Sequence, residues 1–378
     1  MRIGINLLYL LPGEVGGTET YGICLLDALS NMNDSNEYIV YLNRESSSIS
    51  VPIGTRIKYI ACSITARNRI FRYIYEQFWL PILLLKHRVN LVHSLGYVGP
   101  LVTHCKSVVS IPDTNYYDVR ETFTLLRRWV LTVVSTLAAR RASQVVTISE
   151  FSKQQIHKHI GIPLEKITVT HLGPGWLEKP MQLVDWEVLK IRYAIPEKYI
   201  IAFGGGARHK NIQRLLEAYH NQVDIYDYSL VIIGRLPEGV VPPPPPVDGQ
   251  VGPCVQCLGF VPTEHIQSLL SHAALFVLPT LYEGFGLPIL EAQHAGVRVA
   301  SSFAASLPEV GGQGAIYFDP TSVEAIGNAL KQALWLDSEK AETLRVAVQT
   351  NLSRFSWLGT AKSTVAVYRK VLGRECNE

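Results

Sequence analysis

The chain lacks a strong charge imbalance and a membrane-spanning apolar run. Among its 378 residues, 35 Lys and Arg stand against 32 Asp and Glu, a formal net charge of only +3. General nucleic-acid binding needs a concentrated basic excess. The helix expected at Ile70–Leu85 is apolar but interrupted by Arg72, Glu76 and Gln77, and it falls short of the roughly 20 apolar residues that span a bilayer. We therefore expect no nucleic-acid partner and no transmembrane helix.

Cysteine is also scarce. The six cysteines are scattered, at positions 24, 62, 105, 254, 257 and 376, as in a protein of a reducing compartment without a disulfide framework. Cys254 and Cys257 form a CxxC spacing, but no second ligand pair supports a metal or redox site there. The N-terminus has one positive charge and no small-residue cleavage site, so we expect a first strand rather than a signal peptide. A cytoplasmic protein is the resulting expectation.

What the chain does have is a regular alternation of β-branched runs and helical stretches. This pattern predicts parallel sheets with helices on both faces. The length, with 47% hydrophobic residues, suits two domains. We expect strands at residues 2–8, 38–43, 58–62, 90–94, 107–111, 144–149 and 167–171, and a second series at 199–204, 229–234, 255–261, 275–279, 297–301 and 315–318. The alternation breaks from Leu172–Gly175 to Trp186, which predicts domains at 1–175 and 176–356.

Two further segments leave alternatives open. The run Pro242–Pro246 predicts an extended surface loop, with an SH3-type docking site as the alternative. The helix expected at Leu125–Ala142 carries arginines at both ends of an apolar middle, at positions 127, 128, 140 and 141. Such a helix suits an anionic membrane surface, but ordinary packing with arginines extending to solvent explains the same pattern.

The most informative stretch is LPTLYEGFGLPILEA, residues 278–292, which follows an apolar strand and enters a helix closed by Gly296. Pro288 fits the first helical position, so the loop before it would present backbone N–H groups at a helix amino end, where phosphate binds well. We expect Glu291 in the first helical turn, within reach of a ribose. Glu283 is expected on the loop, where a donor sugar would lie.

The spacing of these glutamates resembles the signature of family 4 glycosyltransferases. These are retaining enzymes of the GT-B fold, with two Rossmann-like doubly wound α/β domains facing across a cleft. The resemblance implies that Glu283 contacts the donor sugar and Glu291 the ribose. It also implies that the backbone at Phe285, Gly286 and Leu287 meets the sugar and phosphates.

A glycine-rich strand end, residues 202–206, precedes Arg208, His209 and Lys210. Glycine permits close backbone approach, and cations can neutralise a leaving diphosphate. The segment resembles the family's G-x5-[RK]-K-N element, which implies that Lys210 binds the diphosphate. His209 stands where the family usually has arginine, and Arg208 is the candidate to replace it.

Other donor-site assignments rest on the resemblance. It places Gly16 and Gly17, after the first strand, against the donor phosphates and sugar, although a tight strand–helix turn also explains two glycines. It implies that the backbone near Val261 meets the nucleotide base. The last helix, in residues 357–378, would cross back to the N-terminal domain.

One departure from the family pattern lies at Pro112. The family has a histidine there that hydrogen-bonds the donor sugar, whereas proline has no such donor. Asp113 is expected to reach the acceptor. His93 and His171, at two other strand ends, are candidates for the missing contact, with a purely structural histidine as the alternative.

The resemblance predicts transfer of a hexose from a nucleotide sugar to a saccharide or lipid-linked acceptor. The EQFWLP segment at 76–81 looks most like bacterial mannosyltransferases of surface polysaccharide synthesis, which favours GDP-mannose, with a UDP-sugar as the alternative. No D-x-D motif is present, so we expect neither metal nor cofactor. The expected location is the cytoplasm, with peripheral contact at the inner face of the membrane. One alternative hypothesis is a catalytically inactive scaffold that binds a nucleotide sugar, and it is motivated by Pro112 and His209. A second alternative is an epimerase or phosphorylase of the same fold.

Overall fold

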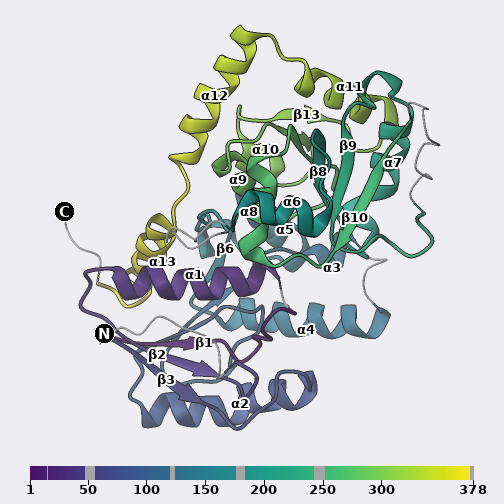
Figure 1. Ribbon diagram of the computed structural model, residues 1–378. Coiled ribbons are helices and arrows are strands. Elements are labelled where there is room, and N and C mark those ends of the chain that lie inside the picture. Colours follow the sequence, from purple (N-terminus) through teal and green to yellow (C-terminus); the bar gives the residue numbers. More distant parts are fainter. Residues whose placement is uncertain (15, 47–55, 120–123, 176–183, 242–251, 375–378) are drawn as a thin grey trace. The chain divides into compact units, whose positions relative to one another are not determined.

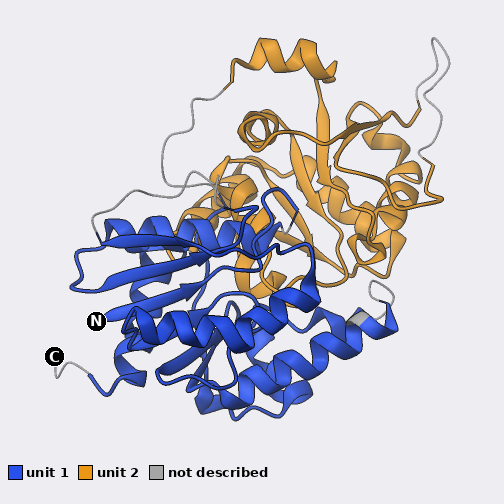
Figure 2. Cartoon of the chain, turned by 90° about the horizontal axis from the view of Figure 1, so that it is seen from below, with its two compact units in different colours: residues 1–176, 355–378 blue, residues 177–354 orange. Residues whose placement is uncertain are grey.

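The computed structural model describes residues 1–374 except 15, 47–55, 120–123, 176–183 and 242–251. The chain divides into two compact units (Figure 2): unit 1 contains residues 1–176 and 355–378, and unit 2 contains residues 177–354. The loop expected at Pro242–Pro246 and much of the segment leading to Trp186 lie outside the described residues.

Unit 1 is built on a seven-stranded parallel sheet with the order β3-β2-β1-β4-β5-β6-β7. The strands are β1 (Arg2–Asn6), β2 (Glu37–Leu42), β3 (Ile57–Ala61), β4 (Leu91–Ser94), β5 (Lys106–Ser110), β6 (Gln144–Thr147) and β7 (Ile167–Val169). The order reverses between β1 and β4, because the chain fills one side of β1 first and then continues from its other side (Figure 1). Such a reversal opens a crevice at the carboxyl ends of the strands.

Helices cover both faces of this sheet. They are α1 (Gly17–Asn31), α2 (Arg69–Lys86), α3 (Asn115–Asp118), α4 (Leu125–Arg141), α5 (Glu150–Ile160) and α13 (Trp357–Val371). Leu84 of α2 packs in one core cluster with Val92, and Ala138 of α4 packs in another with Val109. The strand register pairs Ser94 with Val109, and Ser94 points to the same face as Val92 because successive side chains alternate. Helices α2 and α4 therefore cover the same face.

Unit 2 repeats the design with a six-stranded parallel sheet of order β10-β9-β8-β11-β12-β13. Its strands are β8 (Tyr199–Phe203), β9 (Ser229–Ile233), β10 (Val255–Gly259), β11 (Leu275–Leu278), β12 (Val299–Ser302) and β13 (Ile316–Phe318). Its helices are α6 (Trp186–Tyr193), α7 (Ile212–His220), α8 (Thr263–Ser271), α9 (Leu287–His294), α10 (Leu307–Gly311), α11 (Val323–Leu334) and α12 (Ser338–Leu352). The strand order reverses between β8 and β11. The expected fold class, two doubly wound α/β domains, is confirmed.

Local sequence signals explain where several helices begin. The side chain of Asn68 accepts a hydrogen bond from the Phe71 amide at the start of α2, and Ser356 accepts one from the Gly359 amide at the start of α13. Such caps satisfy amides that have no partner within the helix.

The last helix packs into unit 1 beside α1 (Figure 1). Trp357 Nε1 donates to the Pro174 carbonyl at 2.5 Å, and Thr360 Oγ1 donates to the His171 carbonyl at 2.6 Å. Gly173 makes this close approach possible, because a Cβ atom there would lie 2.6 Å from the Trp357 backbone nitrogen. The start of α13 thus depends on a residue without a side chain.

We predict that Gly173→Ala lowers the melting temperature of the protein by roughly 3–10 °C, since overpacking of this kind costs about 1–3 kcal/mol. Gly206→Ala is the matched control, because no atom lies within 4 Å of a Cβ built there. Differential scanning fluorimetry of both variants checks this, and equal melting temperatures would contradict the packing argument.

Candidate active site

The two main sequence motifs meet at the carboxyl edge of the unit 2 sheet. Residues 204–211 follow β8 and residues 279–286 follow β11, and these are the two strands between which the strand order reverses. The helices after two such strands leave toward opposite faces of a sheet, so their loops separate and leave room for a ligand. The topology therefore brings together motifs that lie about 70 residues apart in the chain.

An ion pair joins the motifs. Lys210 Nζ lies 2.7 Å from Glu283 Oε1, with the two side chains 25% and 20% exposed. Partial burial reduces the screening of this pair by water. The structure thus pairs the residue assigned to the diphosphate with the residue assigned to the donor sugar.

Backbone contacts fix the two loops around this pair. The Leu281 amide donates to the His209 carbonyl at 2.7 Å, and Thr280 Oγ1 donates to the same oxygen at 3.0 Å. Asn211 Nδ2 donates to the carbonyls of Pro279 and Pro320 at 2.9 and 2.8 Å. These contacts position Lys210 opposite Glu283.

The sequence interpretation assigned no role to Asn211 or Thr280. One signal was available for Asn211, which precedes α7 with a backbone φ of 57°. Asparagine tolerates this left-handed conformation better than most residues. For Thr280 no local signal exists, since its hydroxyl acts on a carbonyl that is distant in sequence.

Helix α9 presents its amino end to the same edge. Gly286 caps the helix with φ 114°, and a Cβ atom there would lie 2.7 Å from Leu307 Cδ2. Ser306 Oγ lies 2.8 Å from the Glu283 carbonyl oxygen and 2.7 Å from that of Phe285, which holds the preceding loop. The backbone near Gly286 is therefore fixed where the helix dipole favours an anion.

Two details of α9 correct the sequence expectations. The helix begins at Leu287, so Pro288 is its second residue, and Glu291 is its fifth residue rather than part of the first turn. The expected start was wrong because proline is compatible with both of the first two helical positions. Burial raises the pKa of the Glu291 carboxyl to about 7. An uncharged carboxyl can donate a hydrogen bond as well as accept one.

The basic segment after β8 forms the short 3-10 helix η3 (Arg208–Lys210). Arg208 is exposed, whereas His209 is half-buried and its Nδ1 has no hydrogen-bond partner within the described parts of the chain. Burial, reinforced by the charge of Lys210, lowers the pKa of His209, which favours its neutral form. His209 thus differs electrostatically from the permanently charged arginine of the family pattern.

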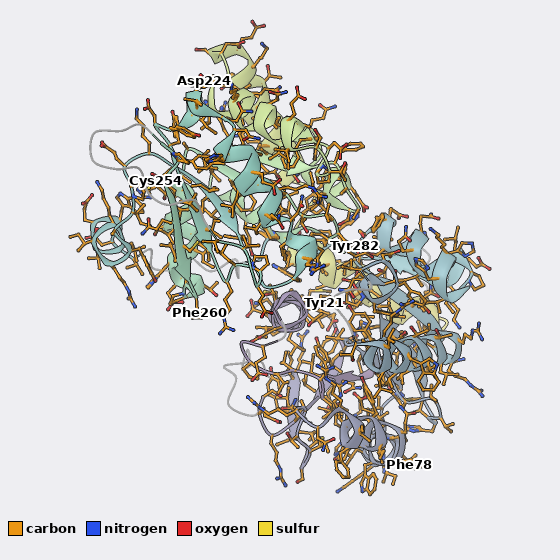
Figure 3. All side chains as sticks on the ribbon, turned by 90° about the vertical axis from the view of Figure 1, so that its right-hand side faces the viewer. Tyr21, Phe78, Asp224, Cys254, Phe260 and Tyr282 are labelled. Carbon is orange, nitrogen blue, oxygen red and sulfur yellow. The ribbon has the colours of Figure 1, made fainter. Side chains whose placement is uncertain are left out.

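Val261 lies two residues beyond β10, at the same edge of the sheet. Its side chain is buried, whereas the neighbouring Phe260 is 88% exposed (Figure 3). Gly259 has a φ of 67°, and its carbonyl accepts from the Gly234 amide at 2.7 Å. The strand therefore ends at Gly259, and Val261 lies in the loop that follows it.

The remaining assigned residues belong to unit 1. Gly16, with φ 57°, is the N-cap of α1, and Gly17 is its first residue. Asp113 follows β5, and its Oδ1 accepts from Tyr97 Oη at 2.9 Å and from the Asn115 amide at 3.3 Å. These residues lie in the connections that follow β1 and β5, with Gly17 already in α1.

His93 does not fit the role suggested for it. It is fully buried, and its Nδ1 and Nε2 lie 2.7 Å from Tyr368 Oη and 2.8 Å from Ser110 Oγ. Tyr21 Oη, from α1, lies 3.0 Å from the same Ser110 hydroxyl. Burial lowers the pKa of His93 to about 3, so the ring is neutral. The expectation that His93 contacts the donor is contradicted, because both ring nitrogens are occupied inside the core.

His171 remains the other histidine candidate. It follows β7, is half-buried, and packs edge-on against Phe355 with ring centroids 5.6 Å apart. Around the site and elsewhere in the described part of the chain, no three His, Cys, Asp or Glu side chains are grouped as metal ligands.

Comparison with known proteins follows the division into units. The family described as Glycosyltransferase Family 4 matches residues 15–173, and the family described as Glycosyl transferases group 1 matches residues 197–335. The chain therefore contains a family 4 glycosyltransferase domain and a group 1 glycosyltransferase domain. The resemblance to glycosyltransferases is confirmed by these two matches, and the group 1 match contains Glu283 and Glu291.

Curated relatives of this chain include O-antigen chain mannosyltransferase B of Escherichia coli, 33% identical over 233 residues, which cover 60% of this chain and 61% of that protein. Serotype-specific mannosyltransferase WbdA of Escherichia coli is 27% identical over 242 residues, which cover 61% of this chain and 29% of that protein. The matches thus span less than two thirds of these relatives. The structure is similar to sucrose-phosphate synthase from Thermosynechococcus elongatus, with a TM-score of 0.74, 16% identity and coverage of 99% and 100% of the two chains.

We predict that Glu291→Gln makes the protein more stable at pH 8 and changes its stability little at pH 5. The folded-state pKa of about 7 lies above the ordinary value of 4.5. The carboxyl therefore contributes stability below pH 4.5 that is lost as the pH rises through 7. By this linkage the gain at pH 8 is at most about 3 kcal/mol. Urea denaturation at both pH values measures the difference, and a variant equally or less stable at pH 8 would show that Glu291 ionises without cost.

Proposed function

We propose that the chain is a retaining glycosyltransferase that moves a hexose, with mannose favoured, from a nucleotide sugar to a hydroxyl of a saccharide or lipid-linked acceptor. The process would be synthesis of cell-surface polysaccharide or glycolipid. The names of the mannosyltransferase relatives support mannose as the sugar. The donor that we favour for it is GDP-mannose. A UDP-sugar is the alternative donor.

The observation that carries the proposal is the Lys210–Glu283 pair beside the amino end of α9. Breaking the bond between the anomeric carbon and the phosphate oxygen develops positive charge on the sugar and negative charge on the diphosphate. Lys210 and Arg208, with the backbone at Leu287, would stabilise the diphosphate, and Glu283 would orient the sugar through its hydroxyls.

The ion pair also suggests how the donor enters. Without ligand, Lys210 and Glu283 neutralise each other at 2.7 Å. A diphosphate carries more negative charge than one carboxylate and would attract Lys210, leaving Glu283 to accept hydrogen bonds from sugar hydroxyls. Donor binding would then replace the Lys210–Glu283 ion pair by two sets of contacts. Lys210 would pair with the diphosphate, and Glu283 would accept hydrogen bonds from the sugar.

Retention would arise by attack on the face from which the diphosphate departs. The acceptor oxygen bonds to the anomeric carbon as the bond to phosphate breaks, and the departing phosphate oxygen takes the acceptor proton. Asp113 would orient the acceptor. We expect this chemistry to need no divalent metal, so transfer should persist in excess EDTA.

The first test is a thermal-shift screen with UDP, GDP, ADP and their sugar conjugates. We expect GDP and GDP-mannose to stabilise the protein, and Glu291→Ala to reduce the shift because it removes the proposed ribose contact. Sugar transfer to an acceptor panel follows. Donor binding without any transfer would instead favour the inactive scaffold, and no stabilisation by any nucleotide would contradict the donor site.

We predict that Lys210→Ala lowers kcat/KM for sugar transfer by about 100-fold or more, since one group that stabilises developing charge contributes about that factor. Lys331→Ala is the matched control. Lys331 pairs with Asp224 at 2.6 Å in the same unit but lies on α11. A similar loss in both variants would mean that the effect is not specific to the site.

We predict that His209→Arg lowers KM for the donor at pH 7.5 by roughly 3- to 10-fold, because it replaces a neutral ring by a permanent cation next to the proposed diphosphate position. His220→Arg, at the exposed end of α7, is the control for added charge. An unchanged or higher donor KM in a variant with normal melting temperature would remove His209 from the donor site.

A further inference from the structure

Helix α2 exposes an apolar face that no described part of the protein covers. Seven large apolar side chains of the helix are 41–72% exposed, and all but Trp79 lie along one face. The six residues of that face, which we call the α2 stripe, are Ile70, Phe71, Ile74, Phe78, Ile82 and Leu85. Surface helices of soluble proteins normally present polar residues outward, and a contiguous exposed apolar patch marks an interaction site.

The face of α2 opposite the stripe is packed against the sheet, and this packing keeps the stripe facing outward. Leu80 and Leu84 are fully buried in the core against the sheet, and Glu76 and Arg72 are 2% and 8% exposed. Asn6 Nδ2 of β1 donates to Glu76 Oε1 at 3.3 Å. The helix therefore cannot rotate to bury the stripe. In Figure 1, α2 lies at the bottom, below the strands of unit 1, and Figure 3 shows Phe78 at the outer edge of the same unit.

The charged residues exposed on α2 itself, and directly after its carboxyl end, are all cationic. The single acidic residue of α2, Glu76, is buried, so the helix exposes no carboxylate. Arg69 at the amino end and Lys86 at the carboxyl end are both exposed, as is Arg88 two residues further on. Arg67, just before the helix, is also exposed and pairs with Glu14. An apolar stripe with cations at both ends of its helix suits a partner that has an apolar interior beneath an anionic surface.

Helix α4 covers the same face of the sheet and adds exposed apolar residues. Leu125, Leu126 and Trp129 in its first turns are 83%, 73% and 65% exposed. Both helices thus direct large apolar side chains away from the same side of unit 1.

We propose that unit 1 binds the surface of an anionic phospholipid bilayer through the α2 stripe. The helix would lie flat in the interface, with its aromatic and aliphatic side chains among the acyl chains and its terminal cations at the headgroups. At 18 residues it is about 27 Å long. None of the helices within the described residues is long and apolar enough to cross a membrane.

The same charges disfavour a second copy of the chain as the occupant. If two α2 stripes packed together in a symmetric dimer, cationic helix ends would face cationic ends in either direction of packing. No exposed carboxylate on α2 would offset this repulsion.

Cosedimentation of the full chain with lipid vesicles tests the proposal without donor or acceptor, so its outcome is independent of the proposed sugar transfer. The vesicles contain phosphatidylcholine alone or with about 30% phosphatidylglycerol, a strongly anionic surface. The test variant is Phe78→Ser/Ile82→Ser. The matched control is Ile191→Ser/Val223→Ser, which removes two apolar residues of unit 2 that are at least as exposed, 81% and 66%, as Phe78 and Ile82, 66% and 63%. Melting temperatures check that both variants are folded.

We expect the wild type and the control to bind the anionic vesicles at least about 10-fold more tightly than the test variant. Arg69→Gln/Lys86→Gln should reduce the preference for anionic over neutral vesicles. The proposal is overturned if the wild type stays in the supernatant, or if the test variant binds as the wild type does. It is also overturned if the wild type forms dimers that the test variant lacks and binds no vesicles.

Discussion

The candidate site depends on the reversal of strand order between β8 and β11. Parallel strands end at one edge of a sheet, and at a reversal the following helices lie on opposite faces, so the two loops separate. In unit 2 the separated loops are rejoined by the Lys210–Glu283 pair and by the Asn211 side chain, which bonds to the carbonyl of Pro279. The topology opens the space, and these polar contacts set its shape.

Burial decides the charge state of several groups at this edge. Glu291 is half-buried and has a pKa of about 7, whereas His209 is held toward its neutral form by burial and by Lys210. The cations of the motif are therefore Lys210, which is paired with Glu283, and Arg208, and His209 adds no permanent charge to them.

The two faces of the unit 1 sheet differ in where their polar and apolar side chains lie. On one face, His93, Ser110 and Tyr368 form a buried hydrogen-bonded network between the sheet and α13. On the other face, Glu76 is buried while the apolar α2 stripe is exposed. The His93 network is satisfied by its own hydrogen bonds, whereas Glu76 bonds to Asn6 through one oxygen only. An exposed apolar patch such as the α2 stripe marks an interaction site.

The sequence alone determined the fold class and the principal motifs. Strand positions follow from short β-branched runs between turn residues, and these are local signals. The Glu283–Glu291 spacing and the Gly204–Lys210 segment are likewise local, so they could be assigned before their relation in space was known. The exact start of α9 could not be assigned, because proline fits either of the first two helical positions.

Only the tertiary structure decided which polar side chains face a ligand and which face the core. The sequence around a strand-end histidine does not tell whether its side chain is accessible or buried. His93 is buried, and its two ring nitrogens lie within hydrogen-bond distance of Tyr368 and Ser110. The apolar run in α2 could equally have been core. Its outward face appeared only once Leu80 and Leu84 had filled the place against the sheet, because burial depends on neighbours that are distant in sequence.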